Sequence, residues 1–241
     1  MSVIDIMRGK AVHAIGGKRD EYQPIRSPIC ATSNPIDIAK VFKDLFNLDE
    51  LYVADLDAIM GRGSNLGIIS RICSEVGMKV MLDSGINNAS HVDEIFDAGV
   101  SKLVLGTESM TTINHLRDLI GSFGGEQIVP SIDVVDGKVI SKCMGLMGER
   151  PARVAMKLES MGVVELILLD ISRVGTERGV DMGLVREVVN AVRVPVLVGG
   201  GIRSLDDILC LKKEGASGVL VATALHKGAL TKDDIEKVMK V

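Results

Sequence analysis

The sequence predicts an α/β protein in which eight strand–helix units close into a barrel. Eight short β-type runs alternate with helix-type segments along 241 residues, a length typical of one such barrel. The β-type runs are apolar throughout, as expected for parallel strands that are covered on both faces. The chain also repeats itself, and two similar halves close naturally into a ring. A doubly wound open sheet is the alternative.

The repeat is visible in two pairs of segments. Residues 3–10, Val-Ile-Asp-Ile-Met-Arg-Gly-Lys, return at 131–138 as Ser-Ile-Asp-Val-Val-Asp-Gly-Lys. Residues 94–110 align with 210–226, so that Gly106-Thr107 matches Ala222-Thr223. The repeat therefore favours a (β/α)8, or TIM, barrel over the open sheet. We expect a single domain, residues 1–241, made of half-barrels at about 1–122 and 123–241.

The predicted strands are short and are separated by helices with recognisable starts. The strands are Val3–Ile6, Leu51–Ala54, Lys79–Leu82, Lys102–Leu105, Ile128–Ile132, Glu165–Leu169, Pro195–Val198 and Gly218–Val221. Apolar residues at helical spacing indicate helices over residues 66–76 and 184–192. Capping residues followed by Pro or an acid mark helix starts at Asn34-Pro35, Ser204-x-x-Asp207 and Thr231-x-x-Asp234.

Composition excludes several classes of function. The net charge is −4, and there are two Tyr, four Phe and no Trp, so nothing favours binding to nucleic acid or to a membrane surface. The four cysteines and four histidines are dispersed, which predicts neither a disulfide framework nor a metal site. No signal peptide precedes the first strand, and no apolar run is long enough to span a bilayer. We expect a cytoplasmic protein, either a monomer or a small homo-oligomer.

The first half carries an insertion after its first strand, at residues 16–24, Gly-Gly-Lys-Arg-Asp-Glu-Tyr-Gln-Pro. A polar, glycine-containing loop at this place would lie over the active face of a barrel. It is either a lid or a tolerated surface insertion. Its charged residues Lys18 and Arg19, and the nearby Arg26, are interpreted as solvated.

Two aspartates are candidate catalytic residues. Asp5 and Asp133 end strands one and five, which lie opposite each other in an eight-stranded ring, and barrel active sites are built at these strand ends. Two carboxyls that face each other across a substrate can give and take protons, as an isomerisation requires. A single Asp at a strand end often only caps a turn. Its recurrence in both halves favours a catalytic pair.

A glycine-rich turn predicts a phosphate site in the second half. Gly199, Gly200 and Gly201 lie between a strand and a helix, where backbone N–H groups can approach an anion. Ala222 and Thr223, after strand eight, are expected to complete this site.

Repeat symmetry predicts a second phosphate site in the first half, formed by Ser84, Gly85, Gly106 and Thr107. Asp83 replaces Gly199 there, and Asn87 replaces Arg203. These changes favour one phosphate, with a hydroxyl-bearing or cationic group at the other end of the substrate. Asp170 and Thr176, in the polar loop after strand six, are also predicted to contact the substrate.

Together these motifs resemble the histidine-biosynthesis isomerase and cyclase family, HisA and HisF, over essentially the whole chain. The resemblance is carried by the paired Ile-Asp-(Ile/Val)-x-x-Gly-Lys strands, the Gly-Thr-Glu-Ser and Gly-Gly-Gly-Ile-Arg turns, the loop at 170–179 and the half-barrel repeat. It implies that Asp5 and Asp133 are the acid and base. It further implies an Amadori rearrangement of a phosphorylated N-linked aminoaldose to an aminoketose, with no metal or organic cofactor.

Several positions depart from the pattern of the family isomerases. Leu169 and Val174 stand where those enzymes have Thr and Asp, and residues 83–87 read Asp-Ser-Gly-Ile-Asn in place of Gly-Gly-Gly-Ile-Arg. In this the chain is similar to an isomerase-related archaeal branch of unassigned function. Three hypotheses stay open: the histidine-pathway isomerase, a related barrel with another phosphorylated substrate, and a non-catalytic barrel that binds a phospholigand.

Overall fold

Eight strands form a closed parallel ring, which the computed structural model describes over residues 1–86 and 89–240. Val3 N–H donates to the Val221 carbonyl at 3.0 Å and so joins the first strand to the end of the last. The (β/α)8 barrel and its eight predicted strands are confirmed. In order around the ring, the strands are β1 Ser2–Met7, β4 Glu50–Asp55, β5 Lys79–Asp83, β6 Lys102–Gly106, β7 Ile128–Val135, β9 Leu166–Asp170, β10 Val196–Gly199 and β11 Gly218–Leu220.

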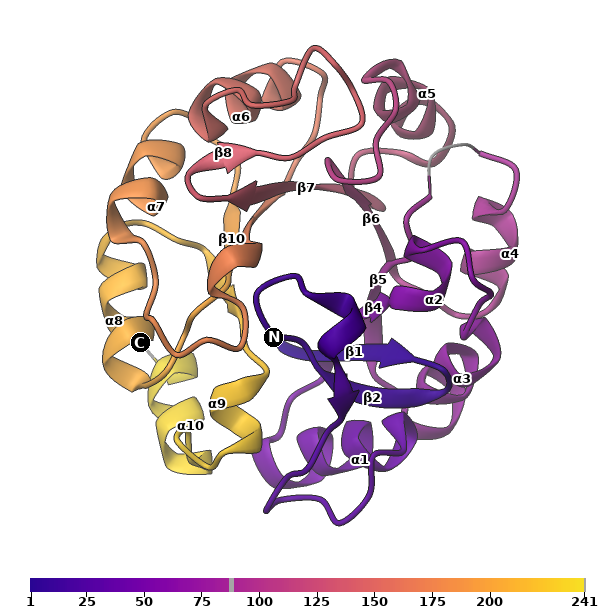
Figure 1. Cartoon of the computed structure of the whole chain (residues 1–241), viewed down its shortest axis with the longest axis vertical. Helices are drawn as coiled ribbons and strands as arrows, with labels where there is room; N and C mark the ends of the chain where they lie inside the picture. Colours follow the sequence, from indigo (N-terminus) through magenta and orange to yellow (C-terminus); the bar gives the residue numbers. More distant parts are fainter. Residues whose placement is uncertain (87–88, 241) are drawn as a thin grey trace.

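Helices surround this ring (Figure 1). They are α1 Pro35–Phe46, α2 Leu56–Ile59, α3 Leu66–Arg71, α4 Val92–Asp97, α5 Asn114–Phe123, α6 Pro151–Glu159, α7 Met182–Val189, α8 Leu205–Lys213, α9 Thr223–His226 and α10 Lys232–Lys240. A π-helical stretch, η2 Ile72–Val76, continues α3 and completes the helix predicted over residues 66–76. The helix predicted over residues 184–192 is α7, which ends earlier, at Val189.

Three helices begin where capping residues predict. The Asn34 side chain accepts a backbone N–H of the first turn of α1, and the Ser204 hydroxyl does the same for α8. At the start of α10, Thr231 and Asp234 accept each other's backbone N–H groups. These bonds satisfy donors that a helix leaves free at its N-terminus, and so they fix where each helix starts.

The apolar side chains form two layers, one on each face of the ring. The outer layer lies between strands and helices and includes Phe42 and Leu103. The inner layer fills the barrel and includes Tyr52, Val104 and Ile167. Because both faces of each strand are buried, the strands are apolar throughout, as the sequence indicated.

Two hairpins extend the first and fifth strands. β2 Lys10–His13 pairs antiparallel with β1, and β8 Lys138–Val139 pairs antiparallel with β7. Both turns place two consecutive residues at positive φ, at 52° and 73° for Arg8-Gly9 and at 49° and 75° for Asp136-Gly137. Two-residue hairpin turns of this kind require positive φ at both positions, which glycine adopts readily. In the repeated Gly-Lys of the two halves, the glycine therefore completes a hairpin turn and the lysine begins the returning strand.

The inserted residues lie over the barrel. The connection between β2 and α1, residues 14–34 and hereafter the β2–α1 segment, contains the short helix η1 Arg19–Glu21 and the strand β3 Gln23–Pro24. Figure 1 shows the indigo part of this segment above the centre of the ring. The predicted position over the active face is thus confirmed, and its opening as a lid stays a prediction.

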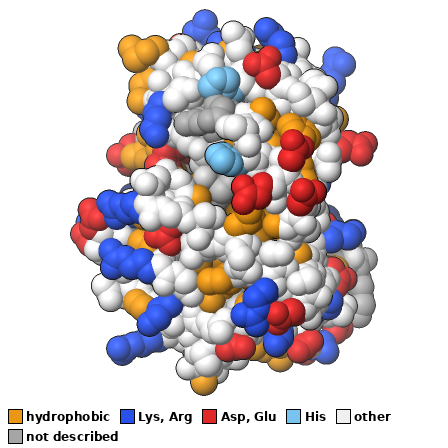
Figure 2. Space-filling view, turned by 90° about the vertical axis from the view of Figure 1, so that its right-hand side faces the viewer, with side chains coloured by type: hydrophobic (Ala, Val, Ile, Leu, Met, Phe, Trp, Pro, Cys, Tyr) orange, Lys and Arg blue, Asp and Glu red, His pale blue; other side chains and the backbone are white. Residues whose placement is uncertain are grey.

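The face of the molecule shown in Figure 2 is polar and mixed in charge. On the face shown in Figure 2, acidic and basic side chains are interspersed with small hydrophobic patches. No helix within residues 1–86 and 89–240 is long and apolar enough to cross a membrane.

Candidate active site

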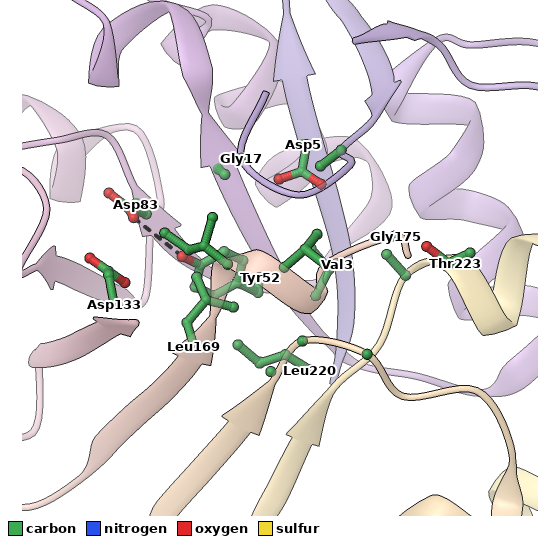
Figure 3. A pocket seen from close by; sticks show the side chains of 18 of the residues that line it. Val3, Asp5, Gly17, Tyr52, Asp83, Asp133, Leu169, Gly175, Leu220 and Thr223 are labelled. Atoms are coloured by element: carbon green, nitrogen blue, oxygen red, sulfur yellow. Dashed lines mark hydrogen bonds between the residues drawn. The ribbon is translucent and has the colours of Figure 1, made fainter. Parts of the chain in front are cut away.

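Three aspartates lie at the carboxyl ends of the strands and face one cavity (Figure 3). Side chains alternate between the two faces of a strand. Asp83 therefore shares the inner face of β5 with the buried Met81, and Asp133 shares that of β7 with Val129. Asp5 occupies the inner face of β1 in the same way. The cavity, hereafter the mouth cavity, is also lined by Tyr52, Leu169, Gly200, Ala222 and Thr223.

The two predicted catalytic residues lie on opposite sides of the ring. Three strands separate β1 from β7 in either direction around the barrel. Asp5 and Asp133 both line the mouth cavity, so a molecule bound there would have a carboxyl group on each side. The structure brings the pair together as the repeat indicated, and their catalytic roles stay a prediction.

Hydrogen bonds hold the Asp133 carboxyl group in place. Ser131 Oγ donates to Oδ1 at 2.8 Å, and Glu108 N–H donates to Oδ2 at 2.9 Å. The Thr107 hydroxyl accepts the Asp133 backbone N–H at 2.9 Å. A Cβ on Gly106 would lie only 2.8 Å from Asp133 Oδ2. Glycine at position 106 therefore leaves the space that this carboxyl group occupies.

Asp83 and Asp5 have different surroundings. Asp83 accepts a hydrogen bond from the Tyr52 hydroxyl at 3.3 Å and one from Gly85 N–H at 3.0 Å. A Cβ added to Gly106 would lie 3.5 Å from Asp83 Oδ2 and 2.8 Å from Asp133 Oδ2, so both carboxyl groups lie close to this glycine. Within the described residues, no hydrogen bond reaches the Asp5 carboxyl group. Asp5 is thus free to bond a ligand.

Burial raises the pKa of all three carboxyl groups, so they are weaker acids than exposed aspartates. It raises the pKa of Asp5 to about 7, although the Arg19 charge opposes the rise. It raises the pKa of Asp133 to about 7, and the nearby Asp83 charge adds to the effect. For Asp83 itself burial raises the pKa to about 6, with the Gly85 hydrogen bond acting in the opposite direction. Carboxyl groups with pKa values near neutrality can both accept and donate protons at neutral pH.

The β2–α1 segment contributes charged and aromatic groups to the mouth cavity. Arg19 Nη2 pairs with Glu108 Oε2 at 2.6 Å, and the Arg19 side chain is only 25% exposed. The interpretation of Arg19 as a solvated charge is therefore wrong, because its partner follows a distant strand. Tyr22 is 8% exposed and also lines the cavity. Gly16 N–H donates to the Val174 carbonyl at 2.8 Å, which ties the segment to the loop after β9.

The predicted phosphate residues of the second half line the mouth cavity. Gly199, Gly200 and Gly201 follow β10, and Ala222 and Thr223 follow β11. Gly200 and Gly201 have φ of 104° and 84°, a conformation that L-residues rarely adopt. Added Cβ atoms would lie 2.3 Å from the Asp170 carbonyl and 2.4 Å from the Gly179 carbonyl. The glycine-rich turn therefore depends on glycine for both backbone conformation and space.

The predicted phosphate residues of the first half are placed differently. Ser84 and Gly85 line a separate depression beside β5, and the buried Ser84 hydroxyl has no hydrogen-bond partner among the residues that the structure describes. Gly106 and Thr107 are buried beneath Asp133. Asn87, which replaces Arg203 in the repeat, lies outside the described residues.

The loop after β9 presents other residues to the mouth cavity than the sequence suggested. Asp170 accepts a hydrogen bond from Ser172 Oγ at 2.5 Å and pairs with Arg173 at 3.1 Å. The Thr176 hydroxyl donates to the Arg173 carbonyl at 2.9 Å. Neither Asp170 nor Thr176 lines the cavity, whereas Leu169 and Val174 do. The two departures from the isomerase pattern thus give this wall apolar side chains, and substrate contact by Asp170 and Thr176 stays a prediction.

A metal site is not formed in the part of the chain that the structure describes, where no three His, Cys, Asp or Glu side chains are grouped to hold an ion. The chemistry available to the mouth cavity from its own side chains is acid–base chemistry by carboxyl groups, with one tyrosine bonded to one of them.

Comparison with known proteins agrees with this geometry. A model of the histidine biosynthesis protein family matches residues 1–231. The chain belongs to this family. It is 34% identical to an uncharacterized protein of Methanocaldococcus jannaschii over 97% of this chain and 95% of the relative.

Other members of the family are named as isomerases of an imidazole-4-carboxamide that carries a phosphoribosyl and a phosphoribosylamino group. One, from Methanothrix thermoacetophila, is 33% identical over 94% of this chain and 92% of the relative. Another, from M. jannaschii, is 29% identical over 87% and 86%. Methanocaldococcus jannaschii thus has both an isomerase and an uncharacterized protein that are similar to this chain.

Tyr52 and Glu108 are among the mouth-cavity residues that the sequence did not single out. Tyr52 lies inside a predicted strand, and only the alternation of its faces could have indicated that it points inward. Glu108 belongs to the repeat but matches Ala224 in the second half, so symmetry did not single it out. Both tyrosines of the chain, Tyr22 and Tyr52, line the cavity. Because the chain has only two tyrosines, their rarity was the one sequence feature that could have marked them as candidate site residues.

Proposed function

We propose that this chain is an aldose–ketose isomerase that acts on a phosphorylated sugar derivative, with Asp5 and Asp133 as its acid and base. One observation carries the proposal: two inward aspartates on opposite strands share a cavity with a glycine-rich turn. The isomerase names of family members support the reaction class. The pKa values of about 7 suit both carboxyl groups to proton transfer at neutral pH.

The reaction needs two proton transfers at adjacent carbons, and two carboxyl groups are enough for them. One carboxyl protonates the ring oxygen as the bond from C1 to that oxygen breaks, and the lone pair of the attached nitrogen forms the C1=N bond of a protonated imine. The other, as carboxylate, removes the proton from C2. The electron pair of that C–H bond forms the C1=C2 double bond of an enolamine, and the C1=N electrons return to nitrogen and neutralise its charge. Proton loss from the C2 hydroxyl and proton gain at C1 give the ketose.

A related isomerase with a different phosphorylated substrate is the second candidate. It is favoured by Leu169 and Val174 in the cavity wall, which differ from the isomerase pattern. It is also favoured by Asp83, another difference, at the end of the cavity beside the loops after β5 and β6, hereafter the first-half end. The histidine-pathway substrate is then one candidate among phosphorylated aminoaldoses, and a cytoplasmic location accords with either candidate.

The test is a turnover assay with the substrate of the related isomerases and with simpler phosphorylated aminoaldoses. Asp5→Asn and Asp133→Asn should each lower kcat by roughly a thousandfold, because each removes one proton-transfer group. Asp136→Asn, an exposed acid on the β7–β8 turn, is the matched control and should keep full activity. Turnover that survives Asp5→Asn or Asp133→Asn would contradict the acid–base assignment. Ligand binding without turnover of any aminoaldose would favour a non-catalytic phospholigand-binding barrel.

A further inference from the structure

The two ends of the mouth cavity differ in their free backbone donors. The end beside the loops after β10 and β11 is hereafter the second-half end. There, the N–H groups of Gly201, Ile202 and Thr223 make no hydrogen bond within the described part of the chain. All three residues line the cavity. Free backbone N–H groups in a glycine-rich turn between a strand and a helix form a site suited to a phosphate group. Glu177 also lines this end, but it is paired with Lys227.

In the first half, two of the three equivalent donors are already used. Gly85 N–H, which matches that of Gly201, donates to Asp83 Oδ1 at 3.0 Å. Thr107 N–H, which matches that of Thr223, donates to the Ser131 carbonyl at 2.9 Å. Ile86 N–H, which matches that of Ile202, makes no hydrogen bond within the described residues. Unlike their second-half counterparts, none of these three residues lines the mouth cavity, and the Glu108 N–H that lies beside it donates to Asp133 Oδ2 at 2.9 Å.

Charge at the first-half end also opposes a phosphate. Asp83, Asp133 and Glu108 all line this part of the cavity, and the nearby cation, Arg19, is bonded to Glu108. A phosphate dianion would meet carboxyl groups at short range in a buried site, where like charges repel strongly. Within the described residues, Asp83 Oδ2 receives one long bond, from the Tyr52 hydroxyl at 3.3 Å, so it can accept a further donor.

We propose that the mouth cavity takes a substrate with a single phosphate, held at the second-half end, and that Asp83 selects hydrogen-bond donors, hydroxyl or ammonium, at the other end. Asp83 is thus a specificity-determining residue of the proposed isomerase, and the inference rests on that proposed function. The related isomerases are named for a compound with two phosphoribosyl-type groups, so this chain would differ from them in the number of phosphates that it binds. The second observation pointing to a ligand is the Asp5 carboxyl group, which faces the same cavity and accepts no hydrogen bond from any described residue.

Calorimetric titration of the full chain tests the proposal with four probes. Ribose 5-phosphate offers one phosphate and hydroxyl groups, glucosamine 6-phosphate offers one phosphate and an ammonium group, ribulose 1,5-bisphosphate offers two phosphates, and inorganic phosphate is the baseline. We expect at least one monophosphate sugar to bind about tenfold more tightly than the bisphosphate, because the second phosphate meets carboxyl groups. Comparison of the two monophosphates separates a hydroxyl preference from an ammonium preference.

Two variants at one position sharpen the test. Asp83→Gly installs the residue that the second half has at Gly199, and it should reduce or reverse the preference for one phosphate. Asp83→Asn keeps the shape and removes the charge, so it should act in the same direction even if the glycine variant folds poorly. The exposed Asp136→Asn variant should leave the preference unchanged. Wild-type binding of the bisphosphate as tight as that of both monophosphates, or failure of every probe to bind, would overturn the proposal.

The experiment separates this inference from the proposed reaction because binding does not require turnover. If Asp83 controls the preference but no aminoaldose is converted, the isomerase proposal fails and the specificity assignment stands. If the compound with two phosphoribosyl-type groups is isomerised at least as efficiently as aminoaldoses with one phosphate, the specificity assignment fails and the isomerase proposal stands.

Discussion

The loops after β5 and β6 and the loops after β10 and β11 occupy equivalent places in the two halves of the barrel, yet their backbones face different partners. In the second half, the N–H groups of Gly201 and Thr223 face the mouth cavity and are free within the described residues. In the first half, an aspartate side chain and the neighbouring strand accept the corresponding N–H groups of Gly85 and Thr107. The specificity proposed above implies that a duplicated scaffold changes from anion binding to anion exclusion where one half has glycine and the other has Asp83, without a change in fold.

The largest difference between the halves should appear at Gly106 and its repeat partner, Ala222. Gly106→Ala would place a Cβ 2.8 Å from Asp133 Oδ2, so the carboxyl group must move. We expect turnover to fall by about a hundredfold, the effect of a misplaced catalytic group. The matched variant Ala222→Gly removes a methyl group and should change turnover by a few-fold at most. Equal effects in kinetic assays of the two variants would contradict the different roles of the halves.

Exchanging each threonine for valine should sharpen the same comparison. Thr107→Val leaves the buried Asp133 N–H without its acceptor, so the free energy of unfolding should fall by about 2 kcal/mol. Thr223→Val removes a hydroxyl whose nearest polar partner is His13, at 3.5 Å, and should hardly change stability. It should instead weaken binding of a monophosphate sugar by a few-fold. Urea unfolding and calorimetry measure the two effects, and a destabilised Thr223→Val would argue against the assignment.

The buried acids of the mouth cavity should make stability depend on pH. The folded chain raises the pKa of Asp83 from 3.8 to about 6 and those of Asp5 and Asp133 to about 7. Folded protein then holds more protons than unfolded protein from about pH 4 to about pH 7. The free energy of unfolding should fall as the pH rises through this window and level off above it. In the Asp83→Asn variant, the free energy of unfolding should fall less steeply with pH below about pH 6, by up to about 1.4 kcal/mol per pH unit. The Asp136→Asn variant should show the same slope as the wild type.

The smallest effect is expected at the β2–α1 segment. Arg19→Met removes the charge that opposes the rise in the pKa of Asp5, so this pKa should increase by a fraction of a unit. Loss of the ion pair with Glu108 should lower the free energy of unfolding by less than about 1 kcal/mol. NMR titration of the Asp5 carboxyl measures the first effect. Lys18→Met, whose side chain is 68% exposed, is the control, and a lower pKa in Arg19→Met would contradict the electrostatic account.

Local sequence signals predicted most of the fold. Strand runs, capping residues and the glycine-rich turn each report on a few neighbouring residues, and periodicity detects such signals well. The repeat added a long-range constraint, because equivalent strands of two half-barrels must lie opposite each other in the ring, and Asp5 and Asp133 end such a pair. The closed barrel follows from these two kinds of signal together.

The rest of the site depends on contacts that periodicity does not encode. Arg19 and Glu108 are 89 residues apart in the chain, and only the closed barrel brings them together. The aspartate at position 83 indicated that the first-half end differs, but not that Asp83 and Asp133 would accept the local N–H groups. Asp170 illustrates the same limit. It lies at the carboxyl end of its strand, as Asp5 lies near the end of β1, yet its carboxyl group pairs with Arg173, three residues on.

The β2–α1 segment touches both halves, bonded to the loop after β9 through Gly16 and to Glu108 through Arg19. A ligand that displaced this segment would move Arg19 relative to Asp5, and so would change the proton affinity of that carboxyl group. Thermodynamic linkage would make such an effect reciprocal, because protonation of Asp5 would alter the affinity for that ligand by the same free energy. We therefore expect ligand binding and proton uptake to be coupled wherever the ligand moves this segment.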